Sequence, residues 1–245
     1  MNAPAGFFQA EAAGLRWLAD VPGGARIVDV LAAGDGFIEL KELPRAAPTA
    51  TAARAFGSTL AVTHTAGAAG WGAAPDGYRG PTFIGRQPLP CEPAETFGIF
   101  YAEQRVLPYL RRAADSHHVD APTRRLVERA CGRLADGDFD DVQPPARLHG
   151  DLWSGNVFWT ADGVCLIDPA AHGGHRETDL AMLQLFGAPL LADILAGYLD
   201  AHPLDDGWRD RVPVHQLHPL AVHAASHGPG YAVPLAEAAR ATLAL

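Results

Sequence analysis

The spacing of hydrophobic positions changes four times along the chain and divides it into helical and extended segments. Apolar side chains recur at helical intervals near the start, which predicts a helix over Phe7–Asp20. Two short β-rich runs then flank Asp35–Gly36, a dipeptide typical of hairpin turns. Helical spacing returns at Thr49, and one further hairpin, with its turn at Asp162–Gly163, interrupts it. The remaining helices are predicted at Thr49–His64, Pro93–Ala114, Pro122–Ala135, Glu177–Phe186, Pro189–Ala201, Trp208–Ser226 and Pro234–Leu245.

This order of elements predicts an α+β protein with two parts. Residues 1–44 form a small front lobe of helix, hairpin and connector, and residues 45–245 form a larger, mostly helical lobe. The most apolar stretch, residues 179–199, is interrupted by Gln184, Pro189 and Asp193. We therefore expect two buried helices there rather than a membrane span.

Composition narrows the classes of partner. The formal net charge is −9 and the basic residues are scattered, which argues against nucleic acid, because nucleic-acid sites need clustered positive charge. The three cysteines, Cys91, Cys131 and Cys165, are far apart and form no zinc-binding spacing. We therefore expect neither a disulfide framework nor structural zinc, and we expect the protein to be cytoplasmic. The sequence predicts no oligomeric state.

One short motif carries the chemistry. The stretch "RLHGDLWSGNVFW" places Asp151 and Asn156 in a tight loop, and "CLIDPA" adds Asp168 after the second hairpin. Mg²⁺ prefers hard oxygen ligands, so Asp168 would supply a charged ligand and Asn156 a neutral one. Asp151 would accept the hydrogen bond of an attacking hydroxyl, a task in which position matters more than basicity. The pattern indicates phosphoryl transfer.

A structural explanation of the same residues stays open at this point. An isolated His-Gly-Asp is common, and an aspartate before proline is often a turn or a helix cap. The hairpin between Asp151 and Asp168 favours catalysis, because protein kinases use the same succession of loop, hairpin and metal-binding aspartate.

A longer block of sequence resembles a known family. The runs "LHGDLWSGNVFW", "LIDPAAHGGHRETDLAMLQLFG", "GSTLAVTHTAG" and "HQLHPLAVHAASHGPGY" closely resemble the fructosamine (ketosamine) kinases. The resemblance covers the chain from about Phe8 to Tyr231. It implies a two-lobe, protein-kinase-like fold related to the aminoglycoside and choline phosphotransferases. It also implies ATP-dependent phosphorylation of a sugar hydroxyl on ketosamines, which are formed by glycation of amines.

The resemblance assigns roles to individual residues. Asp151 matches the catalytic aspartate, and Asn156 and Asp168 match the Mg²⁺ ligands. Asp179 matches an acid that braces the catalytic loop, and His149 is expected to support the same loop. The residues that match the ATP site are Glu11, Glu39, Leu40, Lys41 and Glu42, the last four in the hinge that meets adenine.

In kinase-like folds, a glycine-rich hairpin and a lysine-bearing strand precede the helix that carries the acid matched here by Glu11. Only ten residues precede Glu11, none of them lysine, and Lys41 is the only lysine in the sequence. We therefore expect a small lobe that lacks its first strands and an activity impaired by that loss.

Several polar residues near the motif are candidates for substrate contact. Trp153 could stack on a sugar ring or fill a groove, and a polar cluster follows Asp168. That cluster consists of His175, Arg176 and Glu177. We expect none of the 11 histidines to hold a metal ion.

Two alternatives to a ketosamine kinase stay open. The acceptor could be another small amino-sugar, an aminoglycoside or a choline-like alcohol, or the chain could be a non-catalytic remnant of a kinase fold.

Overall fold

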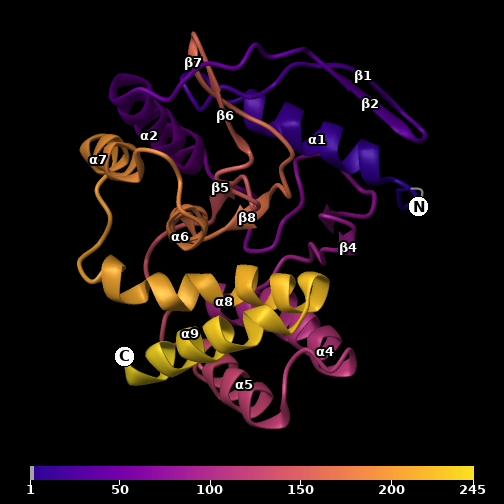
Figure 1. Cartoon of the computed structure of the whole chain (residues 1–245), viewed down its shortest axis with the longest axis vertical. Coiled ribbons are helices and arrows are strands. Elements are labelled where there is room, and N and C mark those ends of the chain that lie inside the picture. Colours follow the sequence, from indigo (N-terminus) through magenta and orange to yellow (C-terminus); the bar gives the residue numbers. More distant parts are fainter. Residues whose placement is uncertain (1–2) are drawn as a thin grey trace. The chain divides into compact units, whose positions relative to one another are not determined.

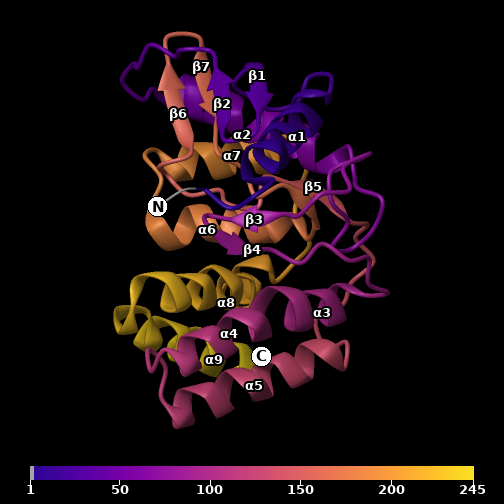
Figure 2. The ribbon, with the colours of Figure 1, turned by 90° about the vertical axis from the view of Figure 1, so that its right-hand side faces the viewer.

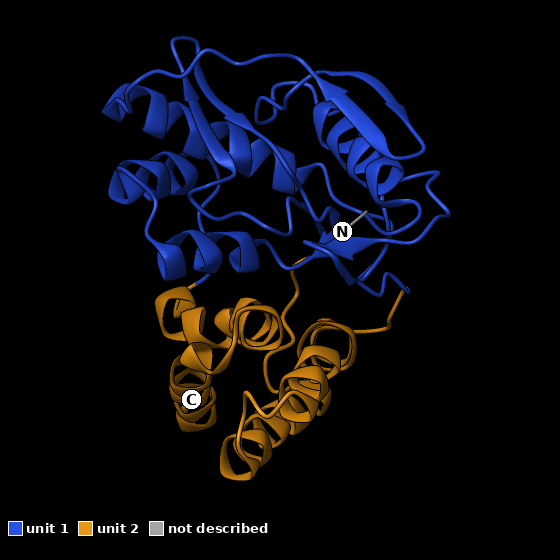
Figure 3. Cartoon of the chain, turned by 45° about the vertical axis from the view of Figure 1, so that its right-hand side comes forward, with its two compact units in different colours: residues 1–92, 144–205 blue, residues 93–143, 206–245 orange. Residues whose placement is uncertain are grey.

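The computed structural model describes residues 3–245, which form nine α-helices and eight short strands in two compact units. Figures 1 and 2 show the elements, and Figure 3 colours the two units. Unit 1 comprises residues 1–92 and 144–205, and unit 2 comprises residues 93–143 and 206–245. The predicted lobe boundary at residue 44 stays a prediction; in the structure this position lies within unit 1.

Unit 1 contains all the strands and four of the helices among the described residues. Its helices are α1 (Phe7–Ala19), α2 (Ala50–Thr65), α6 (Arg176–Phe186) and α7 (Leu191–Ala201). Its strands are β1 (Val30–Gly34), β2 (Phe37–Leu40), β3 (Phe83–Ile84), β4 (Gln87–Pro88), β5 (Ala146–Leu148), β6 (Val157–Thr160), β7 (Gly163–Leu166) and β8 (His172–Gly174).

Unit 2 is entirely helical. Its first helical run comprises α3 (Phe97–Phe100), a π-helical segment (Tyr101–Val106) and α4 (Leu107–Asp115) without interruption. Its other elements are α5 (Ala121–Ala135), α8 (Trp208–His227), a 3₁₀ turn (Pro229–Tyr231) and α9 (Ala232–Ala244).

Mixed helix and strand content, both predicted hairpins and the order of the helices are confirmed. The helix predicted from Pro93 instead begins at Phe97, because the Thr96 side chain accepts a hydrogen bond from the Ile99 N–H and caps it. The short strands β3, β4 and β8 were not predicted, since two or three residues carry no detectable alternation.

The apolar stretch of residues 179–199 forms most of α6 and α7. Helix α6 is largely buried and α7 is partly buried. Within residues 3–245, no helix combines the length and the apolar character needed to cross a bilayer.

Three antiparallel strand pairs frame the motif region of unit 1. Strand β1 pairs with β2, β6 pairs with β7, and β5 pairs with β8. Ile27, which precedes β1, forms a parallel bridge to Leu166 at the end of β7. The front hairpin is thereby joined to the hairpin that follows the loop carrying Asp151.

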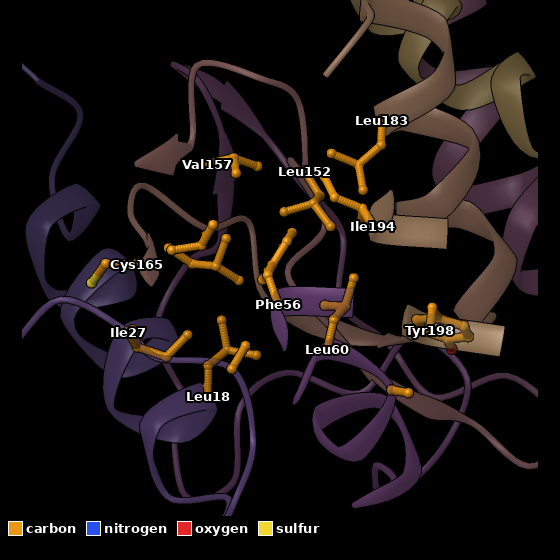
Figure 4. Packing of buried hydrophobic residues seen from close by; sticks show 14 of the residues in the cluster. Leu18, Ile27, Phe56, Leu60, Leu152, Val157, Cys165, Leu183, Ile194 and Tyr198 are labelled. Atoms are coloured by element: carbon orange, nitrogen blue, oxygen red, sulfur yellow. The ribbon is translucent and has the colours of Figure 1, made fainter. Parts of the chain in front are cut away.

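A hydrophobic core holds the strands of unit 1 to its helices (Figure 4). Leu18 from α1 and Ile27 pack with Phe56 and Leu60 from α2, and Leu152 belongs to the same cluster. Full burial of such side chains stabilises a fold by roughly 1.5–3 kcal/mol each. Because Leu152 directly follows the motif aspartate, the core anchors the loop that carries Asp151.

Helices α2 and α7 lie in direct backbone contact within unit 1. A Cβ atom added at Gly57 would overlap the carbonyl of Ile194, and one at Gly197 would overlap the carbonyl of Arg54. The absence of side chains at both glycines therefore permits this close crossing, which also places His64 near Tyr198.

We expect Gly57→Ala to lower the free energy of unfolding by about 1–3 kcal/mol, because the added methyl group forces the helices apart. Helix propensity alone predicts the opposite sign, a gain of about 1 kcal/mol. The matched control is Gly132→Ala in α5, where an added Cβ meets nothing within 4 Å and should stabilise the protein. Denaturant unfolding followed by circular dichroism measures both; equal shifts for the two variants would contradict the contact argument.

Candidate active site

The catalytic loop leaves strand β5 through a glycine that the fold requires. Gly150 has a φ of 79°, a left-handed conformation that side chains disfavour. A Cβ atom at this position would also overlap the carbonyl of Ala170. The sharp turn at Gly150 directs the following Asp151 into the cleft described below.

Asp179, at the start of α6, braces this turn from behind. Its carboxylate accepts the backbone N–H of His149 at 2.7 Å and that of Gly150 at 3.0 Å. Nε2 of His64 lies 3.2 Å from the same carboxylate, and Nδ1 of His64 lies 2.9 Å from the hydroxyl of Tyr198. Both Asp179 and His64 are buried.

The carboxylate of Asp179 remains ionised although it is buried. Burial by itself raises the pKa of Asp179, but the hydrogen bond and charge of His64, together with His149 and the Gly150 N–H, outweigh it. The net result is a pKa below the ordinary value for aspartate. His149 also hydrogen-bonds through Nε2 to the carbonyl of Ile167 at 3.0 Å, so it holds the loop near Asp168.

Asn156 links the two motif aspartates. Its Nδ2 donates to the Asp151 carbonyl at 2.8 Å, to the Asp151 carboxylate at 3.3 Å and to the Asp168 carbonyl at 3.2 Å. All three hydrogen bonds are donated by the amide nitrogen, so the carbonyl oxygen Oδ1 is the group left to act as a ligand. Asp168 itself has a φ of 53°, in the left-handed region.

A cleft within unit 1 opens over three carboxyl groups. The residues that line it are Phe7, Ala10, Glu11, Pro75, Thr82, Phe83, Gly85, Leu89, Asp151, Asp168, Pro169, Ala170 and Ala171. Burial, and then the charge of Asp168, raise the pKa of Asp151 to about 7. The same two causes raise the pKa of Glu11 to about 7.

A second pocket adjoins this cleft and shares Phe7, Glu11 and Asp168 with it. Its further lining residues are Val28, Leu40, Lys41, Leu43, Phe158 and Ile167, which are apolar apart from the lysine. An apolar slot of this kind suits a flat aromatic ring. The structure therefore brings the predicted ATP-site residues Glu11, Leu40 and Lys41 to one pocket.

Two further predicted ATP-site residues, Glu39 and Glu42, stand beside pocket-lining residues in the chain. Glu39 and Glu42 are exposed and are not among the residues that line the pocket. The ammonium group of Lys41 pairs with Asp29 at 3.0 Å at the surface, and the Lys41 N–H donates to the Asp29 carbonyl.

The candidate substrate residues are distributed differently. Trp153 is 42% exposed, and its ring lies against Gly155, where a Cβ would overlap it. His175 is buried, caps α6 through the Glu177 N–H and lies parallel to the ring of Trp71. Buried Arg176 donates to the carbonyl of Pro203 at 2.9 Å. Glu177 is also buried, and none of the three residues of this cluster lines the cleft.

Several residues of the site were not identified from the sequence. Neither His64, predicted only as the end of a helix, nor Tyr198 was assigned to the site, although both lie in the contact network of Asp179. The segment from Pro75 to Leu89 supplies five lining residues of the cleft, but the sequence assigned no site role to any of them. These residues contribute through long-range contacts that a linear pattern does not show.

Comparison with solved structures identifies the class of protein. A candidate fructosamine-3-kinase from Thermobifida fusca superposes with a TM-score of 0.93 at 46% identity, covering 100% of this chain and 83% of that one. A macrolide 2'-phosphotransferase from Brachybacterium faecium superposes with a TM-score of 0.55 at 18% identity, covering 94% of this chain and 78% of that one. The latter likeness shows the fold alone. The fold, the site and these matches define a phosphotransferase of the kinase-like α+β class.

Sequence comparison then gives the family. A sequence model described as fructosamine kinase matches residues 2–244. A probable ketoamine kinase of Enterococcus faecium is 31% identical over 94% of this chain and 80% of its own length. One from Lactiplantibacillus plantarum is 34% identical, with shares of 92% and 78%. The chain belongs to the fructosamine kinase family, as the motif predicted.

The family match extends over nearly the whole chain and gives no support to the expectation that the small lobe lacks strands. Membership of a kinase family implies ATP as the phosphate donor and a small ketoamine as the acceptor.

Glu11→Gln should change stability with pH in a defined direction. Since the folded-state pKa of Glu11 is raised to about 7 from an ordinary 4.5, the folded protein holds the extra proton between these values. The unfolding free energy of the parent therefore falls as pH rises through this window. Because Glu11 is only partly buried, we expect the variant to be more stable by about 1–2 kcal/mol at about pH 8 and unchanged at about pH 4.

Thermal or denaturant unfolding at both pH values, without Mg²⁺ or nucleotide, provides the measurement. Glu39→Gln on β2, an exposed position, is the matched control. A pH-independent difference between parent and Glu11→Gln would mean that the raised pKa is absent.

Proposed function

We propose that this enzyme transfers the terminal phosphoryl group of ATP to a sugar hydroxyl of a ketosamine. The observation that supports the proposal is the position of Asp151 and Asp168 in one cleft, joined by the Asn156 amide, in a member of the fructosamine kinase family. The adjoining apolar pocket suits adenine, and the cleft then receives the phosphates and the acceptor.

In the proposed reaction, Asp151 accepts the hydrogen bond of the acceptor hydroxyl and orients its oxygen toward the terminal phosphorus. A new phosphorus–oxygen bond forms, the bond to the bridging oxygen of ADP breaks, and the hydroxyl proton passes to Asp151. Its raised pKa of about 7 places Asp151 near the pH at which a carboxyl group can both accept and release that proton. Asn156 fixes the carboxylate in position.

The donor atoms present fit Mg²⁺ as the accompanying ion. The carboxylate of Asp168 and Oδ1 of Asn156 are hard oxygen ligands of the kind that Mg²⁺ prefers. Bound there with the nucleotide, the ion would neutralise charge on the phosphates. Asp168 and Asn156 are already held in place by the shared hydrogen bond between Nδ2 of Asn156 and the Asp168 carbonyl.

The proposed acceptor is a fructosyl- or ribulosyl-amine, and Trp153 is proposed as a contact for its sugar ring because the indole is exposed beside the catalytic loop. We further propose that the enzyme acts in the cytoplasm, where ATP and Mg²⁺ are supplied, as an agent of deglycation. Fractionation of cells that express the protein tests the location.

Asp151→Asn should lower kcat by about 10²–10⁴-fold, because the amide cannot accept the proton. The measurement is acceptor-dependent release of ADP from Mg·ATP with fructosyl-lysine and ribulosyl-lysine. Asp162→Asn, in the exposed turn of the neighbouring hairpin, is the control and should keep the parent rate. If the parent enzyme prefers an aminoglycoside or choline over both ketosamines, the proposed acceptor is wrong. If Asp151→Asn keeps the parent rate, the proposed mechanism is wrong.

Asp168→Asn should raise the Mg²⁺ concentration required for half-maximal rate by roughly tenfold or more, because a charged oxygen ligand becomes neutral. Excess Mg²⁺ should restore part of the rate in Asp168→Asn but none in Asp151→Asn. A Mg²⁺ titration of initial rates separates the two roles. Equal Mg²⁺ requirements for the parent and Asp168→Asn would remove Asp168 from the ligand set.

A further inference from the structure

Much of the lining of the cleft comes from one segment of unit 1, residues 67–92, which we call the cleft loop. Its residues Pro75, Thr82, Phe83, Gly85 and Leu89 line the cleft that contains Asp151. None of its residues lines the adjoining apolar pocket proposed for adenine. If adenine occupies the apolar pocket, the cleft loop borders the part of the site that receives the acceptor and the terminal phosphate, and not the base.

Backbone hydrogen bonds hold the beginning of the cleft loop. The Gly72 N–H donates to the Gly173 carbonyl and the Gly173 N–H donates to the Ala73 carbonyl, each at 2.8 Å. The chain then runs to the β3–β4 hairpin, which contains the lining residues Phe83 and Gly85 and is flanked directly by Thr82 and Leu89. Asp76 lies shortly after these hydrogen bonds in the sequence and directly follows Pro75.

Asp76 connects three elements through two side chains. Its carboxylate accepts the indole N–H of Trp17, from α1, at 2.9 Å. The guanidinium of Arg147, from β5, lies 3.6 Å from the same carboxylate and 4.4 Å from the centre of the Trp17 ring. Arg147 also donates to the Trp17 carbonyl at 2.6 Å and to the Gly67 carbonyl at 3.3 Å.

The exposures of these groups decide which contact matters most. The side chain of Arg147 is 13% exposed and that of Asp76 is 62% exposed, so their ion pair by itself contributes little. The hydrogen bond from the indole of Trp17 to the carboxylate is charge-assisted and is the shorter contact. Arg147 mainly fixes Trp17, over whose ring it packs.

Each connected element supplies a different part of the cleft. Helix α1 carries Phe7 and Glu11, β5 leads into Asp151, and Asp76 adjoins Pro75. The contacts of Asp76 therefore link the cleft loop both to α1 and to the strand that leads into the catalytic loop.

We propose that Asp76 is a positioning residue for the acceptor, acting through Trp17 and Arg147 to hold the cleft loop against α1 and β5. This inference rests on the proposed kinase function. It assigns to Asp76 an effect on the acceptor and not on ATP.

Steady-state kinetics of Asp76→Ala with varied ketosamine and varied Mg·ATP tests the assignment. We expect KM for the ketosamine to rise roughly tenfold, with KM for ATP and kcat changed by less than about twofold. Asp76→Asn keeps an oxygen acceptor for the Trp17 N–H and should restore most of the parent KM. Trp17→Phe removes the donor, so it should match Asp76→Ala, and the double variant should be no worse than either single one.

Asp200→Ala is the matched control, because Asp200 pairs with Arg54 at a similarly exposed surface site, 63% exposed, that does not line the cleft. Unchanged KM for the ketosamine in Asp76→Ala overturns the proposal. A lower melting temperature, together with a similar rise in both KM values and a fall in kcat, also overturns the proposal. That outcome assigns Asp76 a purely structural role.

A second measurement does not depend on activity. Arg79 is exposed within the cleft loop, and trypsin should cleave there several-fold faster in Asp76→Ala than in the parent or in Asp200→Ala. If the parent transfers no phosphate to any ketosamine, the proposed function fails, and with it the assignment to the acceptor. The trypsin comparison then still decides whether Asp76 holds the loop, since equal cleavage of all three proteins refutes that contact.

Discussion

The active site depends on one buried carboxylate. Asp179 offers its oxygens to two consecutive backbone N–H groups of the catalytic loop, at His149 and Gly150, and pairs with His64. A buried charge without such partners costs several kcal/mol, so the loop, α6 and α2 are constrained to meet at this point. Tyr198 extends the constraint to α7 through its contact with His64. The close crossing at Gly57 and Gly197 brings α2 and α7 near enough for that contact.

The carboxyl groups of unit 1 differ in protonation because their surroundings differ. Asp179 has hydrogen-bond donors on both oxygens and keeps a lowered pKa despite burial. Asp151 and Glu11 line the same cleft as Asp168, and burial, followed by the charge of Asp168, raises the pKa of each to about 7. Similar side chains thereby differ in pKa according to what surrounds them, and the proton-accepting role of Asp151 belongs to the proposed function.

Much of the site could be predicted from a local pattern. The aspartates and the asparagine of the motif lie within one loop and one hairpin, so their proximity follows from short-range geometry, and the hairpin turn at Asp162–Gly163 is readable from sequence. The family followed from longer runs of matching residues, and the family model confirms it. The motif alone requires no particular pKa of Asp151, whereas in the structure burial, and then the charge of Asp168, raise that pKa to about 7.

The sequence by itself determined the helices, the two hairpins, the motif and the family, because each is recorded in residues that are near one another in the chain. Only the tertiary structure decided which distant residues support that motif. His64 lies more than a hundred positions from Asp179, and Trp17, Asp76 and Arg147 come from three separate elements. Their meeting depends on how helices and strands pack, and side-chain packing over such separations leaves no periodic signal in one sequence.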